Sequence, residues 1–320
     1  MNFDNVTFSG GWIITLPPTQ PTAAWFSGGT SGPMLSSVDR IIFASDTTVA
    51  TIRGPLSLAR MVMSASSTLN NGWIVGGAGA TIPTPPYRNY YSTVDRITYS
   101  TDTNTASVRG SLSSARGYMK GAGNDSYGWH AGGFVSPTSY ASVERIEYAI
   151  DTATLSTRGS LTTTRNSHSA VGTDIYGWVI AGYANGAAAS IVERITYSTD
   201  TASAAVRGPL TANRYQHAST GNESYGWSAN GYVAPGPTIS SSITRIAYQN
   251  DTSTSINRGS MATAFQNGSG TGDSNYGWYT AGASSSVYQR LDYNNDTGTA
   301  STRGTLTVTK YNAAANSGVN

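Results

Sequence analysis

Length, composition and charge exclude several classes of protein at once. The chain has 320 residues, with 19 Lys and Arg against 17 Asp and Glu, so its net charge is only +2. Such a balance provides neither a basic footprint for nucleic acid nor an acidic solvating tail. The chain has no cysteine, which excludes disulfides, thiolate metal ligands and cysteine nucleophiles. Its 36 Gly and 20 Tyr, without any stretch of helical periodicity, predict an all-β fold.

The first 22 residues are predicted to form an extended arm, because they contain Pro17, Pro18 and Pro21 and match no later part of the chain. The longest apolar run there, from Trp12 to Leu16, is too short for a signal peptide or a membrane span. We therefore expect neither conventional secretion nor membrane insertion.

From about residue 23 onward, the chain consists of six copies of one unit, spaced 45 to 56 residues apart. Three markers define the copies. The marker Trp recurs at Trp25, Trp73, Trp129, Trp178, Trp227 and Trp278; the mid-unit Arg at Arg40, Arg96, Arg145, Arg194, Arg245 and Arg290; and an Arg-Gly pair begins at Arg53, Arg109, Arg158, Arg207, Arg258 and Arg303. A period near 50 with four strand-sized pieces is typical of a propeller blade.

Each unit is predicted to form four short antiparallel strands. The first follows the Arg-Gly-x-Leu element, as at 165–172, and the second runs from Tyr-Gly-Trp to a Gly pair. The third carries Val-Glu-Arg-Ile-x-Tyr, rich in β-branched and aromatic residues. An Asp-Thr turn then leads into the fourth strand, which ends at Arg-Gly. We expect no helix in any connection.

These strands resemble the kelch repeat, in which an opening Arg, a Tyr strand ending in Gly-Gly, a Val-Glu strand and an Asp-x-x-Thr turn follow one another. The resemblance covers residues 23–320. It departs where Ala106, Ser107 and Val108 replace an expected aromatic residue, and where Ala181, Asn230 and Ala281 replace the first Gly of the pair. The variant Val-Asp-Arg-Ile-x-Tyr-x-x-Asp-Thr-x-Thr-x-x-x-Arg-Gly-x-Leu resembles repeats in virion structural proteins of marine bacteriophages, especially cyanophages.

The resemblance implies one six-bladed kelch-like β-propeller over residues 23–320, with four-stranded antiparallel blades. The chain enters at a second strand, Ala24 to Gly29, and ends after a first strand that begins at Lys310. We therefore expect the C-terminal strand to join the N-terminal blade and close the ring, which leaves no exposed sheet edge between the two.

Charged residues that recur in every copy are interpreted as structural, because a binding site is needed once whereas a blade contact is needed six times. A desolvated guanidinium requires a carboxylate or carbonyl partner. The six mid-unit Arg match six turn Asp one to one: Asp46, Asp102, Asp151, Asp200, Asp251 and Asp296. These Asp could instead cap their own turns, and the sequence leaves both roles open.

No catalytic, metal or cofactor site is predicted. His168 and His217 occupy equivalent places in successive first strands, but a third metal ligand is missing. No Ser-His-Asp arrangement is predicted around His130 or the other two histidines, because the repeat already accounts for each Asp near them. The few acids outside the repeat, Asp4, Glu147 and Asp292, have nothing that would bring two of them together.

The connections between second and third strands vary, at 30–35, 78–91, 134–141, 183–190 and 232–241, and they emerge on one face. Function on a scaffold usually lies in such loops. This face is the predicted recognition surface, and its richest element follows Pro85 and Pro86; an inert loop is the equally weighted alternative. The candidate binding residues are Tyr87, Arg88, Asn89, Tyr90, Tyr91, Tyr140, Tyr183 and Tyr232.

We expect a non-enzymatic virion structural protein, a tail or fibre appendage or a capsid decoration, made in the host cytoplasm. Its partners would be other virion proteins and a host-surface glycan or receptor, with no nucleic acid; homo-oligomers are compatible with the sequence. One alternative is an intracellular kelch-type scaffold, although about 22 spare residues cannot form a recruiting domain. A glycan-active enzyme is the third alternative, for which no acid can be nominated.

Overall fold

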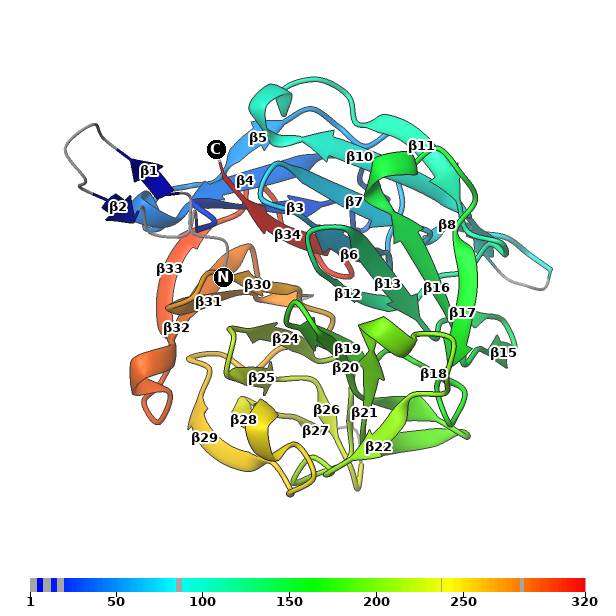
Figure 1. Cartoon of the computed structure of the whole chain (residues 1–320), viewed down its shortest axis with the longest axis vertical. Helices are drawn as coiled ribbons and strands as arrows, with labels where there is room; N and C mark the ends of the chain where they lie inside the picture. The colour runs from blue at the N-terminus through cyan, green and yellow to red at the C-terminus, as the bar shows by residue number, and fades with distance from the viewer. Residues whose placement is uncertain are drawn as a thin grey trace.

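The computed structural model describes residues 5–7, 13–15, 20–84, 88–236, 238–282 and 285–319. Mostly antiparallel four-stranded sheets stand side by side around a ring, which is the arrangement of a β-propeller (Figure 1). The fold is all-β, as predicted. Within the described ranges, no helix is long and apolar enough to cross a membrane.

Five of the sheets are separate and have four strands each. Their strands, from the innermost outward, are β34 (Ala314–Gly318), β3 (Ala23–Ser27), β4 (Val38–Ile42) and β5 (Thr51–Arg53); β6 (Ser64–Ser67), β7 (Asn71–Val75), β10 (Thr93–Thr98) and β11 (Ser107–Ser111); β12 (Lys120–Gly123), β13 (Tyr127–Ala131), β16 (Ser142–Glu147) and β17 (Ser156–Ser160); β24 (Ala218–Gly221), β25 (Tyr225–Ala229), β28 (Ser242–Ala247) and β29 (Ile256–Ser260); and β30 (Gly270–Gly272), β31 (Tyr276–Thr280), β32 (Val287–Asp292) and β33 (Ser301–Thr305). Each sheet follows the predicted strand order of one repeat.

The fourth repeat differs from the prediction, because its strands belong to an eight-stranded sheet. That sheet contains β18 (Arg165–Asn166), β19 (Ser169–Gly172), β20 (Tyr176–Ala184), β21 (Ala187–Thr196), β22 (Ala205–Arg207), β23 (Arg214–Tyr215), β26 (Tyr232–Val233) and β27 (Thr238–Ile239). Strands β19 to β22 pair antiparallel in the order of the repeat. The sheet extends further because β20 and β21 run on into a long hairpin, in which Ala189 of β21 pairs with Arg214 of β23.

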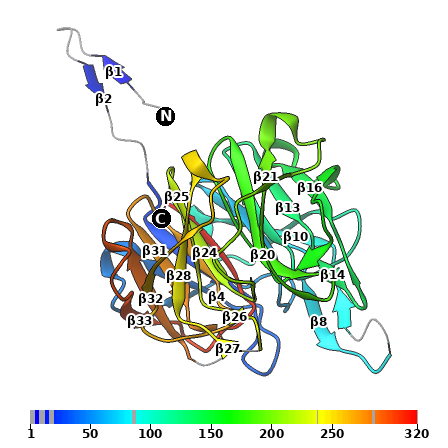
Figure 2. The same ribbon diagram turned by 90° about the horizontal axis from the view of Figure 1, so that it is seen from below.

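Smaller hairpins mark the two sides of the ring. They are β8 (Ala78–Thr81) with β9 (Arg88–Tyr90), β14 (Phe134–Val135) with β15 (Thr138–Ser139), and β1 (Asn5–Thr7) with β2 (Ile13–Thr15). In Figure 2, β8, β14, β26 and β27 lie on one side of the ring, and β1 and β2 lie on the other. We call the first side the loop face. The β1–β2 hairpin falls within the predicted arm, and the rest of residues 1–19 lie outside the described residues.

The turn before the fourth strand is a single 3-10 turn, whereas no helix was predicted in any connection. The turns are η1 (Phe43–Ser45), η2 (Tyr99–Thr101), η3 (Tyr148–Ile150), η4 (Tyr197–Thr199), η5 (Tyr248–Asn250) and η7 (Tyr293–Asn295). In η2, the repeated Asp102 is the residue that ends the turn. Because 3-10 turns are short connectors, strand periodicity in the sequence does not reveal them.

Aromatic stacking joins each sheet to the next. Trp25 stacks on Tyr99 of η2 with ring centroids 3.8 Å apart. Equivalent stacked pairs, at 3.7–3.9 Å, are Trp73–Tyr148, Trp129–Tyr197, Trp178–Tyr248, Trp227–Tyr293 and Trp278–Phe43. An aromatic pair contributes about 0.5–1.5 kcal/mol beyond the burial of its area. The hydrophobic core is therefore distributed over the interfaces between sheets.

A circle of backbone hydrogen bonds surrounds the central channel near the loop face. Asn312 N–H donates to Asn267 O at 2.8 Å, and Val62 N–H donates to Asn312 O at 2.8 Å. The remaining bonds, at 2.8–3.2 Å, run from Tyr118 to Val62, from Ser167 to Tyr118, from Gln216 to Ser167 and from Asn267 to Gln216. All six residues have a left-handed backbone, with φ between 54° and 59°. We call this circle the backbone belt.

Candidate functional site

The residues predicted to be structural meet at the interfaces between sheets. Asp102 Oδ2 accepts hydrogen bonds from Trp25 Nε1 at 2.8 Å and from Arg40 Nη1 at 3.1 Å. Arg53 Nε lies 3.4 Å from the same oxygen. One carboxylate of a 3-10 turn thus holds a Trp and two Arg of the preceding sheet. We call this arrangement the interblade clasp.

Within the described residues, the interblade clasp occurs six times. The others join Asp151 to Trp73, Arg96 and Arg109; Asp200 to Trp129, Arg145 and Arg158; Asp251 to Trp178, Arg194 and Arg207; Asp296 to Trp227, Arg245 and Arg258; and Asp46 to Trp278, Arg290 and Arg303. The prediction that each Asp pairs with one mid-unit Arg was therefore incomplete, since each Asp also binds the Arg of the Arg-Gly pair. The sequence showed that both Arg recur, but not that they converge on one carboxylate.

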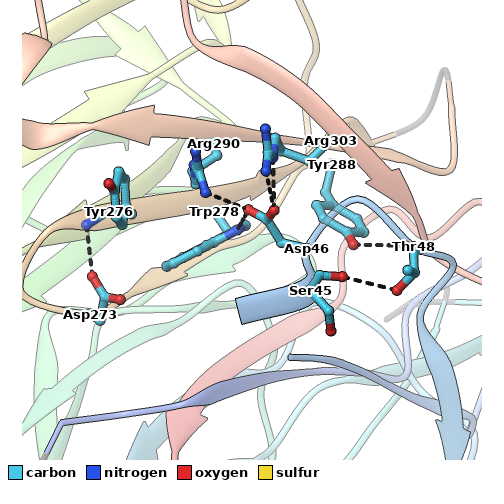
Figure 3. Close-up of polar contacts among 9 residues, drawn as sticks. All are labelled: Ser45, Asp46, Thr48, Asp273, Tyr276, Trp278, Tyr288, Arg290 and Arg303. Atoms are coloured by element: carbon cyan, nitrogen blue, oxygen red, sulfur yellow. Dashed lines mark hydrogen bonds and ion pairs between the residues drawn. The ribbon is translucent and has the colours of Figure 1, made fainter. Parts of the chain in front are cut away.

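The clasp of Asp46 joins the last repeat to the first (Figure 3). Asp46 accepts from Trp278 Nε1 at 2.9 Å and from Arg290 Nη1 at 3.1 Å, and Arg303 donates Nε–H to its other oxygen at 2.8 Å. Tyr288 also donates its hydroxyl to Thr48 O at 2.9 Å. The side chain of Asp46 is buried, so its charge depends on these donors for compensation.

A second set of ion pairs lies within individual repeats, except that Lys310–Asp39 joins the two ends of the chain. The first-strand cation meets the acid of the third strand in Arg60–Asp95 at 3.2 Å, in Arg116–Glu144, in Arg165–Glu193 and in Lys310–Asp39. Arg214 departs from this pattern, because Thr244 occupies the acid position. Arg214 donates instead to Asn230 O at 2.9 Å, Ser242 O at 3.1 Å and Ser242 Oγ at 2.7 Å. Burial lowers the pKa of Arg214 to about 10.

The three histidines are buried. His130 Nδ1 lies 2.7 Å from Ser64 Oγ, whereas the rings of His168 and His217 face the backbone carbonyls of Ala131 and Ile180. Burial first, and then the nearby charge of Arg165, lower the pKa of His168 to about 3. Across the described residues, no three His, Cys, Asp or Glu side chains are grouped so that they could hold a metal ion.

Only some of the candidate binding residues in the loop of the second repeat lie within the described residues. Tyr87, with Pro85 and Pro86, lies outside the described residues. Arg88, Asn89 and Tyr90 form β9, where Arg88 Nη1 donates to Gly79 O at 3.2 Å and Asn89 is exposed. Tyr90 packs with Tyr118 against the buried Met61, Val62 and Ala78. Arg88 is thus anchored to its own hairpin, and Asn89 is the more accessible side chain.

Tyr91 and Tyr140 are partly buried near first-strand arginines. The guanidinium of Arg116 lies 5.7 Å from the ring centroid of Tyr140. Tyr91 occupies the corresponding place in the second repeat, where Gly79 leaves room for its hydroxyl: a Cβ at Gly79 would lie 2.4 Å from it. Both rings therefore support the scaffold as well as bordering the loop face.

Tyr183 and Tyr232 lie together on the loop face and share a third aromatic neighbour, Tyr215. The rings of Tyr183 and Tyr215 meet edge-on at 5.6 Å, and those of Tyr215 and Tyr232 stack at 5.0 Å. Tyr183 is 38% exposed. Burial first, and then the neighbouring tyrosines, raise the pKa of Tyr215. We call these three residues the tyrosine triad.

Tyr215 was not among the predicted binding residues, because it follows Arg214 at the start of a first strand and not in a variable loop. The only signal was the tyrosine itself, where the third and fourth repeats carry Gly117 and Asn166. Its place between Tyr183 and Tyr232 depends on the pairing of β23 with β26, in which Tyr215 lies opposite Tyr232.

No family model matches the chain, and no curated protein is significantly similar to it.

Proposed function

We propose that the ring is a six-bladed kelch-like propeller closed by the C-terminal strand. Six interblade clasps and six residues of the backbone belt support a count of six. Strands β19 to β22 serve as the fourth blade within the larger sheet. Closure is supported by the pairing of β34 with β3, in which Ala23 lies opposite Gly318.

On this scaffold, we propose a non-enzymatic recognition protein that binds a host-surface glycan through the tyrosine triad. This proposal rests on one observation: three tyrosines from three different strands lie together on the loop face. Aromatic faces stack on the apolar C–H face of a sugar ring, while tyrosine hydroxyls can bond to sugar hydroxyls. Tyrosine also supplies contact area at a low cost in side-chain entropy.

The proposed setting is a bacteriophage virion, in which the chain is a tail or fibre appendage or a capsid decoration. The repeat variant noted in the sequence is the support for this setting, together with the low net charge of +2. Other virion proteins would be its assembly partners. Mass spectrometry of purified particles tests the setting: stoichiometric protein in washed particles supports it, and protein found only in the soluble fraction of infected cells contradicts it.

Binding of immobilised glycans tests the recognition function. Tyr215→Ala should weaken binding of a recognised glycan at least tenfold, because the central ring of the triad is lost. Tyr215→Phe retains the ring and should lose less than Tyr215→Ala. Tyr176→Ala provides a control, since Tyr176 packs under Arg194 in the fourth repeat, at the other end of β20 from Tyr183. Equal binding by wild type and Tyr215→Ala would contradict the proposed glycan site.

A further inference from the structure

The connections between second and third strands, which build the loop face, are uncharged along almost their whole length. Their sequences contain no Asp, Glu, Lys or His, and Arg88 is the one Arg among them. The connections are residues 27–37, 75–93, 131–142, 180–191, 229–242 and 280–287. All 17 acidic residues of the chain therefore belong to other segments. A ligand that approaches these connections meets hydroxyls, amides, aromatic rings and backbone groups.

The cations at the start of the first strands do not present a charged group to a ligand, because they are buried. None of them is more than 1% exposed: Arg60, Arg116, Arg165, Arg214 and Lys310. Arg214, which precedes Tyr215 of the triad, is held by Asn230 O and by the carbonyl and hydroxyl oxygens of Ser242. An anionic ligand on the triad therefore does not reach its guanidinium.

The strand partners of the tyrosine triad are uncharged as well. Tyr183 of β20 pairs with Asn166 of β18, whose side-chain amide donates to Ser139 Oγ at 2.9 Å. Tyr232 of β26 pairs with Ile239 of β27. Tyr183 and Ile239 are each 38% exposed. The triad thus presents aromatic and apolar surface next to neutral amide and hydroxyl groups.

This surface discriminates ligands by their charge. The face of an aromatic ring is the negative part of its quadrupole, so it repels a carboxylate or sulfate placed above it. An anion that leaves water for such a surface also loses hydration without gaining a counter-charge. A cation is attracted by ring faces, but Tyr215 and Tyr232 stack on each other at 5.0 Å and do not surround an open space. An uncharged, hydroxyl-rich sugar avoids the penalty that an anion meets.

We propose that the glycan bound at the tyrosine triad is uncharged, a chain of neutral hexoses or N-acetylated hexosamines without carboxylate, sulfate, phosphate or free amino groups. This inference rests on the glycan-binding function proposed above and specifies the class of its ligand. The apolar C–H faces of the sugars pack on the tyrosine rings, and neutral hydroxyl and amide groups of the loop face bond to the sugar hydroxyls.

Matched pairs of oligosaccharides of equal length and linkage provide the direct test. The pairs are galactan and galacturonan, glucan and glucuronan, and mannan and mannuronan, in which a hydroxymethyl group is replaced by a carboxylate. Chitin oligosaccharides and their deacetylated counterparts make the same comparison for positive charge. Equilibrium binding of the full chain should be at least about tenfold tighter for the uncharged member of every recognised pair, the cost of one uncompensated polar group.

An added cation provides a second test at the same surface. Asn213 is exposed, and its backbone oxygen accepts from Ala234 N–H at 3.1 Å, just after β26. Asn213→Lys therefore places an ammonium near the triad and should narrow the preference for the neutral member by about threefold, the value of an exposed ion pair. Asn70→Lys adds the same charge in the turn between β6 and β7, at the other end of β7 from its loop connection, and should leave the preference unchanged.

The results separate failure of this inference from failure of the glycan site. Equal or tighter binding of a charged chain than of its neutral partner, lost in Tyr215→Ala, would overturn the uncharged ligand and leave the glycan site in place. An unchanged preference in Asn213→Lys would overturn the assignment of charge discrimination to this surface. Absence of binding to every chain, or binding that Tyr215→Ala does not weaken, would overturn the glycan site and this inference with it.

Discussion

Asp46 accepts a hydrogen bond from Trp278 at 2.9 Å although 232 residues separate them in the chain. The same carboxylate holds Arg290 and Arg303 of the last repeat. Five other carboxylates do the same between sequential repeats, so the contact between the chain's two ends has the same chemistry as the contacts inside it. Since the interfaces are equivalent, their disruption should have similar consequences.

Asp46→Asn should lower the free energy of unfolding by about 3 kcal/mol. The side-chain shape is kept, but two Arg lose their buried counter-charge and the Trp loses a charged hydrogen-bond acceptor. The measurement is urea denaturation at pH 7. Asp151→Asn is the matched variant at an internal interface and should lose a similar amount. A loss below about 1 kcal/mol in Asp46→Asn, with a full loss in Asp151→Asn, would show that the terminal interface carries little stability.

Low pH should destabilise the protein by protonating the Asp carboxylates of the interblade clasps. Burial tends to raise the pKa of Asp200, but hydrogen bonds from Arg158 and Trp129 and the charges of Arg145 and Arg158 outweigh it, so the pKa lies below its usual value of 3.8. A carboxyl whose pKa is lower in the folded state stabilises it above the unfolded pKa. This contribution is lost as the pH falls below about 4 toward the folded pKa. Unfolding measured from pH 6 to pH 2 should show a shallower acid limb for Asp200→Asn than for wild type.

The buried histidines should add a second loss of stability at higher pH. The folded-state pKa of His168 is lowered to about 3 by burial and by nearby cations. Below its unfolded pKa of about 6.5, the unfolded chain binds a proton that the folded protein does not, so stability falls as the pH decreases.

His168→Met tests this effect, because Met63 and Met119 occupy the equivalent position in the second and third repeats. The variant should be less sensitive to pH between about 6.5 and 4, with a free energy of unfolding at pH 8 within about 1.5 kcal/mol of wild type. An unchanged slope in that range, measured by urea denaturation, would show that His168 is not responsible for it.

Thr244→Glu should supply the carboxylate that Arg214 lacks. Glu144 and Glu193 occupy the same position in the third and fourth repeats and pair there with Arg116 and Arg165. The variant should raise the free energy of unfolding by about 1 kcal/mol, since a hydrogen bond between charged groups contributes about 1.5–3 kcal/mol before the cost of burying the new charge. Thr244→Gln, with nearly the same shape but no charge, is the control. A Glu variant no more stable than the Gln variant would contradict the role assigned to the charge.

The sequence alone determined the features that recur in every copy. Strand order and the recurrence of Trp, Arg and Asp at fixed positions follow from period and residue type, because a contact needed in every repeat leaves the same residue in every repeat. The all-β fold and most strand positions could be predicted for this reason. The 3-10 turns at Tyr99 and its equivalents could not, since a single turn leaves no periodicity.

Only the tertiary structure decided which residues of different repeats meet. It brought two Arg onto one Asp, merged the fourth repeat into a larger sheet through Ala189 and Arg214, and placed Tyr215 between Tyr183 and Tyr232. The physical reason is that these contacts depend on the curvature of the ring and on hairpin length. Both are set by packing between segments distant in the chain and have no counterpart in local residue patterns.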